Sequence, residues 1–310
     1  MKQSILLLLA IFFLQSSWAQ FSNLRIGDIY IFKSRPLIIN TSSFGSTGRT
    51  LPTVLEDFWT FNDTILYKNQ QEIDKLYESG NKDYVILSKE KRTIKRSARQ
   101  GDFNQSLSKT KVPILAYRKI EDLEERPQYY MYLPKVDVAS GNICNIIAVK
   151  ILHNHLSGML RSGSTSTLVS FAAKEREKYC KELKSIEILL SEGLVNKKNK
   201  KKIESKISYR IKFTGRSDNM LLDNYLDHSE IREAFQRGED KVIALAITYS
   251  YDRISDGFTG RIVPSDFRVL VHARTGRFYA AWGPGVTVTS SNTHRFLKYK
   301  ELKKTEKKCR

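Results

Sequence analysis

The sequence has 310 residues and a formal net charge of +19, with 52 Lys or Arg against 33 Asp or Glu. This length allows one large domain or two smaller ones with a sizeable core. The charge excludes no fold, but it directs attention to anionic partners. Beyond the N-terminal region, no segment is apolar and long enough for a transmembrane helix.

Residues 1–19 have the layout of a secretory signal peptide. Lys2 supplies the positive start, Ile5–Leu14 is an apolar stretch too short to span a bilayer, and Ser17-Trp18-Ala19 supplies the small residues that precede cleavage. The residue directly after the cleavage point is Gln20 and not a cysteine, which disfavours a lipid anchor. We therefore expect cleavage near Ala19 and a periplasmic or secreted mature chain.

Residues 25–40 predict two short strands separated by Pro36. Residues 41–50 are rich in Ser and Gly and predict a loop. This loop holds Gly45 and Gly48, but it lacks the Lys-Ser/Thr of a P-loop and the third glycine of a dinucleotide-binding motif. A nucleotide site is therefore not expected.

Basic residues dominate the first part of residues 89–110, a polar segment that lacks apolar periodicity. We expect a mobile basic loop, inserted into the first lobe, that binds anions through exposed cations. The candidate anion-binding residues are Lys91, Arg92, Lys95, Arg96 and Arg99. The alternative is a solvated surface with no specific partner.

The middle of the chain predicts paired strands at residues 111–120 and 128–138, and then a buried strand in the apolar run 143–152. Residues 162–169 are rich in Gly, Ser and Thr and are the predicted linker between two lobes. Residues 170–190 place apolar side chains on one helical face and are the longest predicted helix.

Lysines dominate residues 196–202, which we expect to be too polar to pack. Strands are predicted at 207–213 and 242–251, and residues 267–282 predict a hairpin with a glycine turn. This hairpin is similar to the closing strands of PepSY-type secreted inhibitory modules, although the usual Asp before the turn is missing. Residues 291–310 are predicted to be an exposed or disordered basic tail.

Two segments of the chain repeat one pattern. Glu72–Gly80 and Glu230–Gly238 both read Glu-Ile, three residues, an aromatic, two residues and Gly, and an apolar run follows each. The apolar spacing predicts a helix that ends at the glycine and leads into a strand. A weaker match relates residues 152–158 to 271–276, each expected to be a strand that enters a glycine turn.

These repeats predict an α+β fold of two related lobes, residues 20–161 and 170–290. Each lobe is expected to be a mostly antiparallel sheet packed with one or two helices. The alternative is that a helix, a glycine and a strand, which are a common combination, occur twice by chance.

The chain has three cysteines and no CxxC motif, so neither a thioredoxin-like motif nor a zinc ribbon is indicated. In an oxidising compartment, Cys144 and Cys180 are the expected disulfide pair. Cys309 is expected to be unpaired or to pair with another molecule. The alternative is that Cys144 and Cys180 are buried thiols.

Residues that carry chemistry are sparse. His153 and His155 would share one face of a strand and could begin a metal site, with His228, His272 or an acidic residue as a third ligand. We favour incidental histidines, and no metal or cofactor is expected. HExxH and GxSxG are absent, and no sequence partner marks Cys180 as a nucleophile.

We therefore expect an exported, non-enzymatic protein that is a binding or cell-envelope-associated module. Its candidate partners are an anionic envelope polymer or lipid head groups, and specific nucleic-acid binding is not expected. The alternative is a hydrolase of an envelope polymer with an unrecognised site, which a deep polar cleft with converging His and carboxylate groups would indicate.

Overall fold

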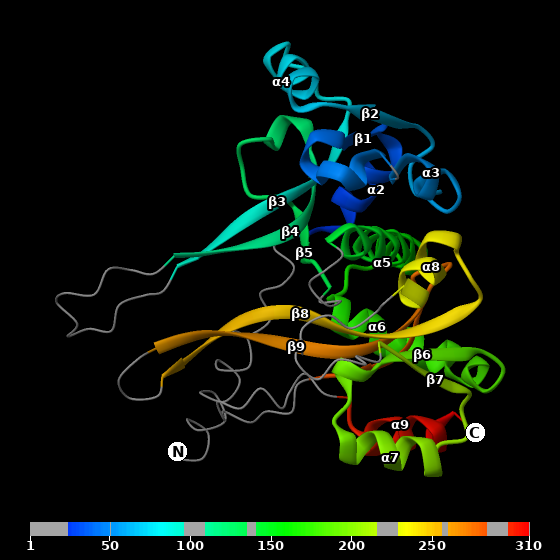
Figure 1. Ribbon diagram of the computed structural model, residues 1–310. Helices are drawn as coiled ribbons and strands as arrows, with labels where there is room; N and C mark the ends of the chain where they lie inside the picture. The colour runs from blue at the N-terminus through cyan, green and yellow to red at the C-terminus, as the bar shows by residue number, and fades with distance from the viewer. Residues whose placement is uncertain are drawn as a thin grey trace, which may run out of the picture.

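A computed structural model describes residues 24–49, 51–95, 109–134, 141–215, 229–255, 260–283 and 297–309. Helices and two five-stranded sheets form two lobes, which confirms the predicted α+β fold. The long helix α5 (Gly141–Ser162) lies between the sheets (Figure 1). Among the described helices, none has the length and apolar character needed to cross a membrane.

The first lobe has the strand order β2-β1-β3-β4-β5. Strand β1 runs parallel to β2 and β3, whereas β4 runs antiparallel to β3 and β5. In chain order the elements are α2 (Ile26–Ser34), β1 (Leu37–Asn40), η1 (Thr41–Arg49), α3 (Leu51–Glu56), β2 (Ile65–Lys68), α4 (Gln70–Glu78), β3 (Val85–Lys95), β4 (Lys109–Lys119), η2 (Ile120–Asp122), β5 (Tyr129–Tyr132) and α5.

The second lobe repeats this order as β7-β6-β8-β9-β10, with the same parallel and antiparallel pairings. Both sheets are therefore mixed, and in each sheet the antiparallel pairings join more residues than the parallel pairings do. The elements are α6 (Leu168–Tyr179), η3 (Cys180–Lys184), β6 (Glu187–Ser191), η4 (Glu192–Leu194), α7 (Lys197–Lys206), β7 (Ile211–Thr214), α8 (Ser229–Arg237), β8 (Lys241–Ser255), β9 (Gly260–His272), β10 (Phe278–Trp282) and α9 (Tyr299–Lys308).

The repeated pattern occupies equivalent places in the two lobes. It forms α4 followed by β3, and α8 followed by β8, and each helix is followed by a glycine with positive φ, 72° at Gly80 and 60° at Gly238. The helix–glycine–strand prediction is confirmed at both places. The weaker match is wrong, because residues 152–158 lie within α5. Descent of the lobes from one duplicated unit stays a prediction.

Helix α5 replaces the strand predicted at residues 143–152. Its side chains are buried on nearly all sides, since one apolar cluster contains Ile146 and Val149 of α5, Leu87 of the first sheet and Leu245 of the second. A helix that is apolar all round belongs inside a protein, and a short apolar run does not distinguish such a helix from a buried strand. The two lobes thus share one core.

Several other segments differ from their predicted state. Residues 26–34 are helical rather than extended, and the helix predicted for 170–190 ends at Tyr179 because the apolar residues after it enter β6. The lysine-rich segment 196–202 begins α7, which buries Ile203. The paired strands β4 and β5 and the hairpin of β9 and β10 are confirmed.

The predicted basic tail is also different from expectation, because its last part forms α9. Leu302, Thr305 and Glu306 of this helix are buried against the second sheet. Their spacing places them on one side of the helix, and Lys304 between them is exposed to solvent. The apolar stripe is narrow, so composition alone made this segment read as exposed.

Gly276 allows the turn after β9 to touch the backbone of α5. Its φ is 67°, and a Cβ atom at this position would lie 2.4 Å from the carbonyl oxygen of Lys150. Gly80 also has positive φ, but a Cβ atom there would meet nothing within 4 Å. Alanine at Gly80 would therefore measure the free-energy cost of the backbone conformation alone, whereas alanine at Gly276 would add the cost of a steric clash.

We expect Gly276→Ala to lower the free energy of unfolding by about 3 kcal/mol or more, because it adds a clash to an unfavourable backbone conformation. Gly80→Ala should cost only about 1 kcal/mol. Urea denaturation of the two variants and the parent measures both values. Equal losses would contradict the close approach at Gly276.

Candidate anion-binding surface

The predicted anion-binding residues do not form one loop. Residues 89–95 belong to β3 and pair with β4, so the expected mobile loop is wrong for this part. Lys91 is exposed and Arg92 is half-buried, while Lys95 ends the strand. Arg96 and Arg99 lie outside the described residues.

Arg92 is engaged by two tyrosines of β5, in the same sheet. Its Nη1 donates hydrogen bonds to the hydroxyl of Tyr130 and, at 3.0 Å, to the hydroxyl of Tyr132. The guanidinium also lies 4.4 Å from the centre of the Tyr130 ring. Successive side chains of a strand point to opposite faces, so Arg92 and Lys91 do not act together. Arg92 therefore belongs to the packing of the hairpin rather than to an anion site.

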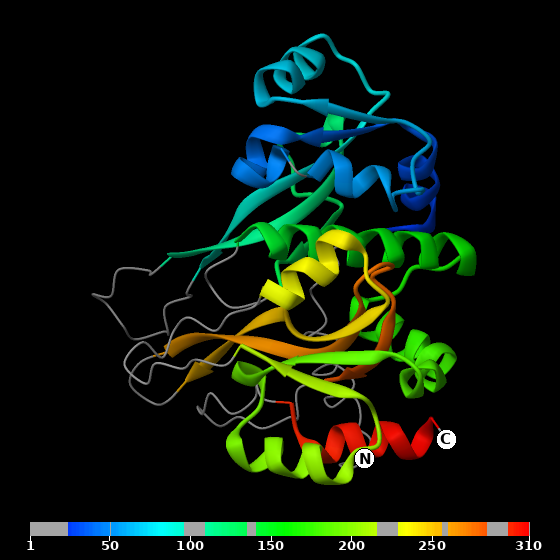
Figure 2. The ribbon, with the colours of Figure 1, turned by 45° about the vertical axis from the view of Figure 1, so that its right-hand side comes forward.

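A denser basic surface lies at the other end of the molecule, on α7 and α9. These helices lie side by side at the bottom of Figures 1 and 2, where α9 is red. We call this surface the lysine face. Ten exposed lysines form it, and Glu204 is the exposed acid between them. The lysines are Lys197, Lys198, Lys201, Lys202, Lys206, Lys298, Lys300, Lys304, Lys307 and Lys308.

The charge pattern of α7 is unfavourable for the helix itself. Lys197 and Lys198 lie at its N-terminal end, where the helix dipole disfavours cations. Lys201 and Lys202 follow at spacings of three and four residues, which place like charges next to each other. Each such contact costs a few tenths of a kcal/mol, so these lysines do not serve the stability of α7.

Polar contacts fix α9 beside α7. Lys303 Nζ donates to the carbonyl of Lys206 at 3.0 Å, and the amide of Tyr299 donates to Asn199 at 3.2 Å. Glu306 accepts hydrogen bonds from Ser208 and Lys303. Although burial raises the pKa of Glu306, these bonds outweigh it and lower that pKa to about 2. These contacts hold the two helices side by side.

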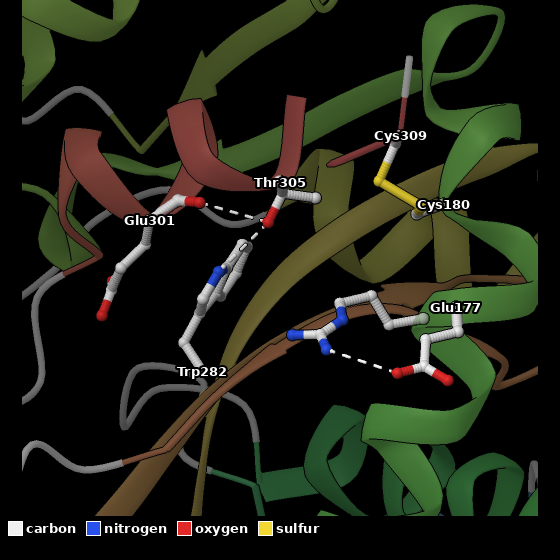
Figure 3. The surroundings of a disulfide bond; sticks show 7 residues. Glu177, Cys180, Trp282, Glu301, Thr305 and Cys309 are labelled. Carbon is white, nitrogen blue, oxygen red and sulfur yellow. Dashed lines mark hydrogen bonds and ion pairs between the residues drawn. A yellow bond between two sulfur atoms is a disulfide. The ribbon is translucent and has the colours of Figure 1, made fainter. Parts of the chain in front are cut away.

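Three further contacts anchor α9 to the second lobe, two of them to strands of its sheet. Arg268 of β9 donates to both carboxylate oxygens of Glu301, at 2.6 and 3.2 Å. Trp282 Nε1 donates to the Thr305 hydroxyl at 3.2 Å (Figure 3). A disulfide joins Cys309, just after the end of α9, to Cys180, just after α6 (Figure 3).

The expected Cys144–Cys180 disulfide is therefore wrong. Cys144 lies near the start of α5, between the two sheets, whereas Cys180 lies next to the last turn of α9. The pairing depends on α9 folding back onto the second lobe. The local sequence around Cys309 is rich in lysine and does not predict this packing.

The predicted metal hypothesis fails on geometry. His153 and His155 lie on α5, where residues two apart point to nearly opposite sides. His153 Nε2 accepts from the amide of Thr60 at 3.2 Å, and His155 Nδ1 lies 2.9 Å from the Tyr129 hydroxyl. The part of the chain that the structure describes contains no group of three or more His, Cys, Asp or Glu that could hold a metal ion. His228 is outside it.

Burial keeps both of these histidines neutral. It lowers the pKa of His153 to about 4, aided by the charge of Arg161, and lowers the pKa of His155 to about 3. Burial also lowers the pKa of His272, although its hydrogen bond to Asp240 opposes that shift. These neutral imidazoles on α5, buried at His155 and half-buried at His153, contribute to packing and not to a reactive site.

We expect the protein to lose stability as the pH falls from about 6.5 towards 4. The unfolded histidines bind protons in this range while the folded ones do not, so each lowers the free energy of unfolding by up to about 1.4 kcal/mol per pH unit. Urea denaturation across this range, for the parent and for His153→Gln/His155→Gln, measures the slope. An unchanged slope in the double variant would contradict the assignment.

Comparison with known proteins returns no matching family, no similar curated protein and no similar solved structure. The function is therefore inferred from the chemistry of the lysine face.

Proposed function

We propose that this chain is an exported, non-enzymatic binding protein whose lysine face engages an anionic polymer of the cell envelope. The observation that carries this proposal is the concentration of ten exposed lysines, with one exposed acid, on two adjacent helices. A solvated surface that served only solubility would not need its cations gathered in one place.

Electrostatics determine what such a surface can bind. At physiological ionic strength the screening length is about 8 Å, so neighbouring lysines act together on one bound chain but are screened from distant charges. Within the lysine face, Tyr299 is the aromatic residue, and it is half-buried. Stacking on flat rings therefore adds little, and we expect binding that depends on charge density more than on polymer sequence.

Export is part of the same proposal. Residues 1–19 have the layout of a signal peptide and lie outside the described residues. The Cys180–Cys309 disulfide is consistent with an oxidising compartment, where such bonds persist. A polyanion outside the cytoplasm is then the ligand available to the lysine face.

Removing charge from α7 should weaken binding. We expect Lys197→Gln/Lys198→Gln/Lys201→Gln/Lys202→Gln/Lys206→Gln to bind immobilised poly(glycerol phosphate) at least about tenfold more weakly at physiological salt. The salt dependence should also be shallower, because binding through fewer lysines releases fewer counterions from the polymer. The measurement is the dissociation constant across a salt series. Thermal stability should not fall, because these lysines repel one another.

A second variant with the same change in net charge is the matched control. It replaces five exposed lysines elsewhere, namely Lys75, Lys82, Lys91, Lys111 and Lys174, with Gln. This variant should bind nearly as the parent does. Equal loss in both variants would show that only net charge matters and would overturn the proposal. Tighter binding to phosphatidylglycerol vesicles than to the polymer would assign the face to lipid head groups instead.

Export has its own test. N-terminal sequencing of the protein from the cells that produce it should give Gln20 as the first residue, because cleavage is expected after Ala19. Recovery of a chain that still begins at Met1 in the cytoplasm would overturn the extracytoplasmic assignment.

A further inference from the structure

We propose that the Cys180–Cys309 disulfide makes the lysine face responsive to redox conditions, so that a dithiol reductant lowers the affinity of this face for the anionic polymer. This inference rests on the proposed function of the lysine face. It adds a means of regulation that comes from the way α9 is attached.

The two halves of α9 are held by different kinds of contact. The first half is fixed by buried Leu302 and by the ion pair of Glu301 with Arg268, whose side chain is almost fully buried. In the part of the chain that the structure describes, the last turn is followed by one further member of the apolar cluster under the helix, Cys309, which is 1% exposed. Its other contacts are the hydrogen bonds of Thr305 and Glu306. The disulfide thus holds the end of the helix in place.

Three lysines of the face depend on this last turn. Lys304, Lys307 and Lys308 are exposed and lie within five residues of Cys309. Helix ends fray when nothing holds them, because the last carbonyls lack partners inside the helix. Fraying would release these lysines from fixed positions and would also expose the buried carboxylate of Glu306, which adds a negative charge to the surface.

The chemistry is thiol–disulfide exchange with a dithiol. A thiolate of the dithiol attacks one sulfur of the Cys180–Cys309 bond and forms a mixed disulfide, and the other cysteine leaves as a thiolate. The second thiol of the reductant then displaces the protein sulfur. Two electrons and two protons pass from the dithiol to the protein, which gives two cysteine thiols and an oxidised, cyclic dithiol. Attack requires the last turn of α9 to open, since Cys180 is also buried.

The test compares binding of poly(glycerol phosphate) by the full-length mature chain before and after treatment with dithiothreitol. We expect roughly threefold weaker binding after reduction, because mobile lysines must be ordered again when the polymer binds. Cys180→Ser/Cys309→Ser should bind like the reduced parent and should not respond to dithiothreitol. Cys144→Ser should respond as the parent does.

A third variant links the effect to the last turn. Lys304→Gln/Lys307→Gln/Lys308→Gln should bind more weakly than the parent and should lose the response to dithiothreitol. Hydrogen exchange should become faster at the amide of Cys309, which donates to the carbonyl of Thr305 at 2.9 Å, while the rest of the chain is unchanged.

The outcomes separate the two proposals. Equal binding by the oxidised and reduced parent, together with weak binding by the α7 lysine variant, would overturn the redox inference and leave the proposed function standing. Loss of the whole fold on reduction would also overturn it, because the response would not be local to α9. Absence of salt-sensitive binding in the oxidised parent would overturn both.

Discussion

The ammonium group of Lys150 lies at the junction on which the rest of the structure depends. It extends from α5 and donates to the carbonyls of Phe235, at 2.7 Å, and Ala273, at 2.9 Å, both in the second lobe. The Phe235 carbonyl lies near the C-terminal end of α8, where helices have unpaired acceptors and favour a cation. A charge taken out of water is costly unless such partners are present. Burial lowers the pKa of Lys150 to about 8, the charge of Asp57 opposes this shift, and the charge of Arg274 adds to it.

Around Lys150, the second lobe packs on α5 through backbone as well as side chains. The amide group of Asn154 donates to the carbonyl of Gly276 at 3.3 Å, one turn along the helix from Lys150. Gly158 lies against the ring of Phe171 on α6, with no room for a larger side chain unless the ring moves. Because these contacts are short and directional, they fix the relative position of the lobes more tightly than apolar packing alone would.

The lobes stack in the same orientation rather than face to face. In the first lobe, Ile73 of α4 packs on Ile86, on the side of the sheet away from α5. In the second lobe, Ile231 of α8 lies in the same apolar cluster as Ile243 and the side chains of α5. Equivalent helices therefore lie on the outer side of one sheet and on the inner side of the other. The stack has two different ends, and the lysine face is one of them.

This arrangement explains why α5 and α9 differ so much in sequence. Both follow the last strand of a sheet and cover its equivalent side, as shown by α5 packing with Val85 and α9 packing with Val242. Helix α5 has a second lobe against its other side, so it is apolar all round. Helix α9 ends the stack and faces solvent, so it keeps one apolar stripe. Terminal units of stacked proteins need such a polar outer side.

Structure that follows from one local segment was predictable from the sequence, whereas structure that depends on how the two lobes stack was not. The units α4–β3 and α8–β8 were predictable because apolar spacing and a terminal glycine act within one segment. The residue-by-residue correspondence of β3 and β8 was not predictable. Val85 pairs with β1 as Val242 pairs with β6, and in that alignment the connection after Gly238 is one residue shorter than the connection after Gly80. A shift of one residue exchanges the two faces of a strand.

The candidate site shows the same division. The density of lysine in residues 196–202 was visible in the sequence, and so was the charge of the C-terminal segment. That these segments form one surface was not visible, because Leu302 and Cys309 make contacts with residues more than a hundred positions away. Arg92 of the β3–β4 hairpin was a predicted anion-binding residue, but its guanidinium donates to a tyrosine hydroxyl of β5. The sequence therefore predicted segments of high positive charge, and packing places two of them side by side on one surface.

The lysine face lowers the stability of α7, one of the two helices that carry it. Like charges on α7 destabilise the helix, and Lys197 and Lys198 oppose its dipole. The structure compensates with buried Ile203 and Leu302, the Arg268–Glu301 pair and a disulfide, all on the inner side of the two helices. A surface that needs this much support gains nothing for folding from its charge. Residue choices that disfavour folding are expected where a protein meets its ligand, and the unfavourable charges of α7 therefore support the proposed binding role of the lysine face.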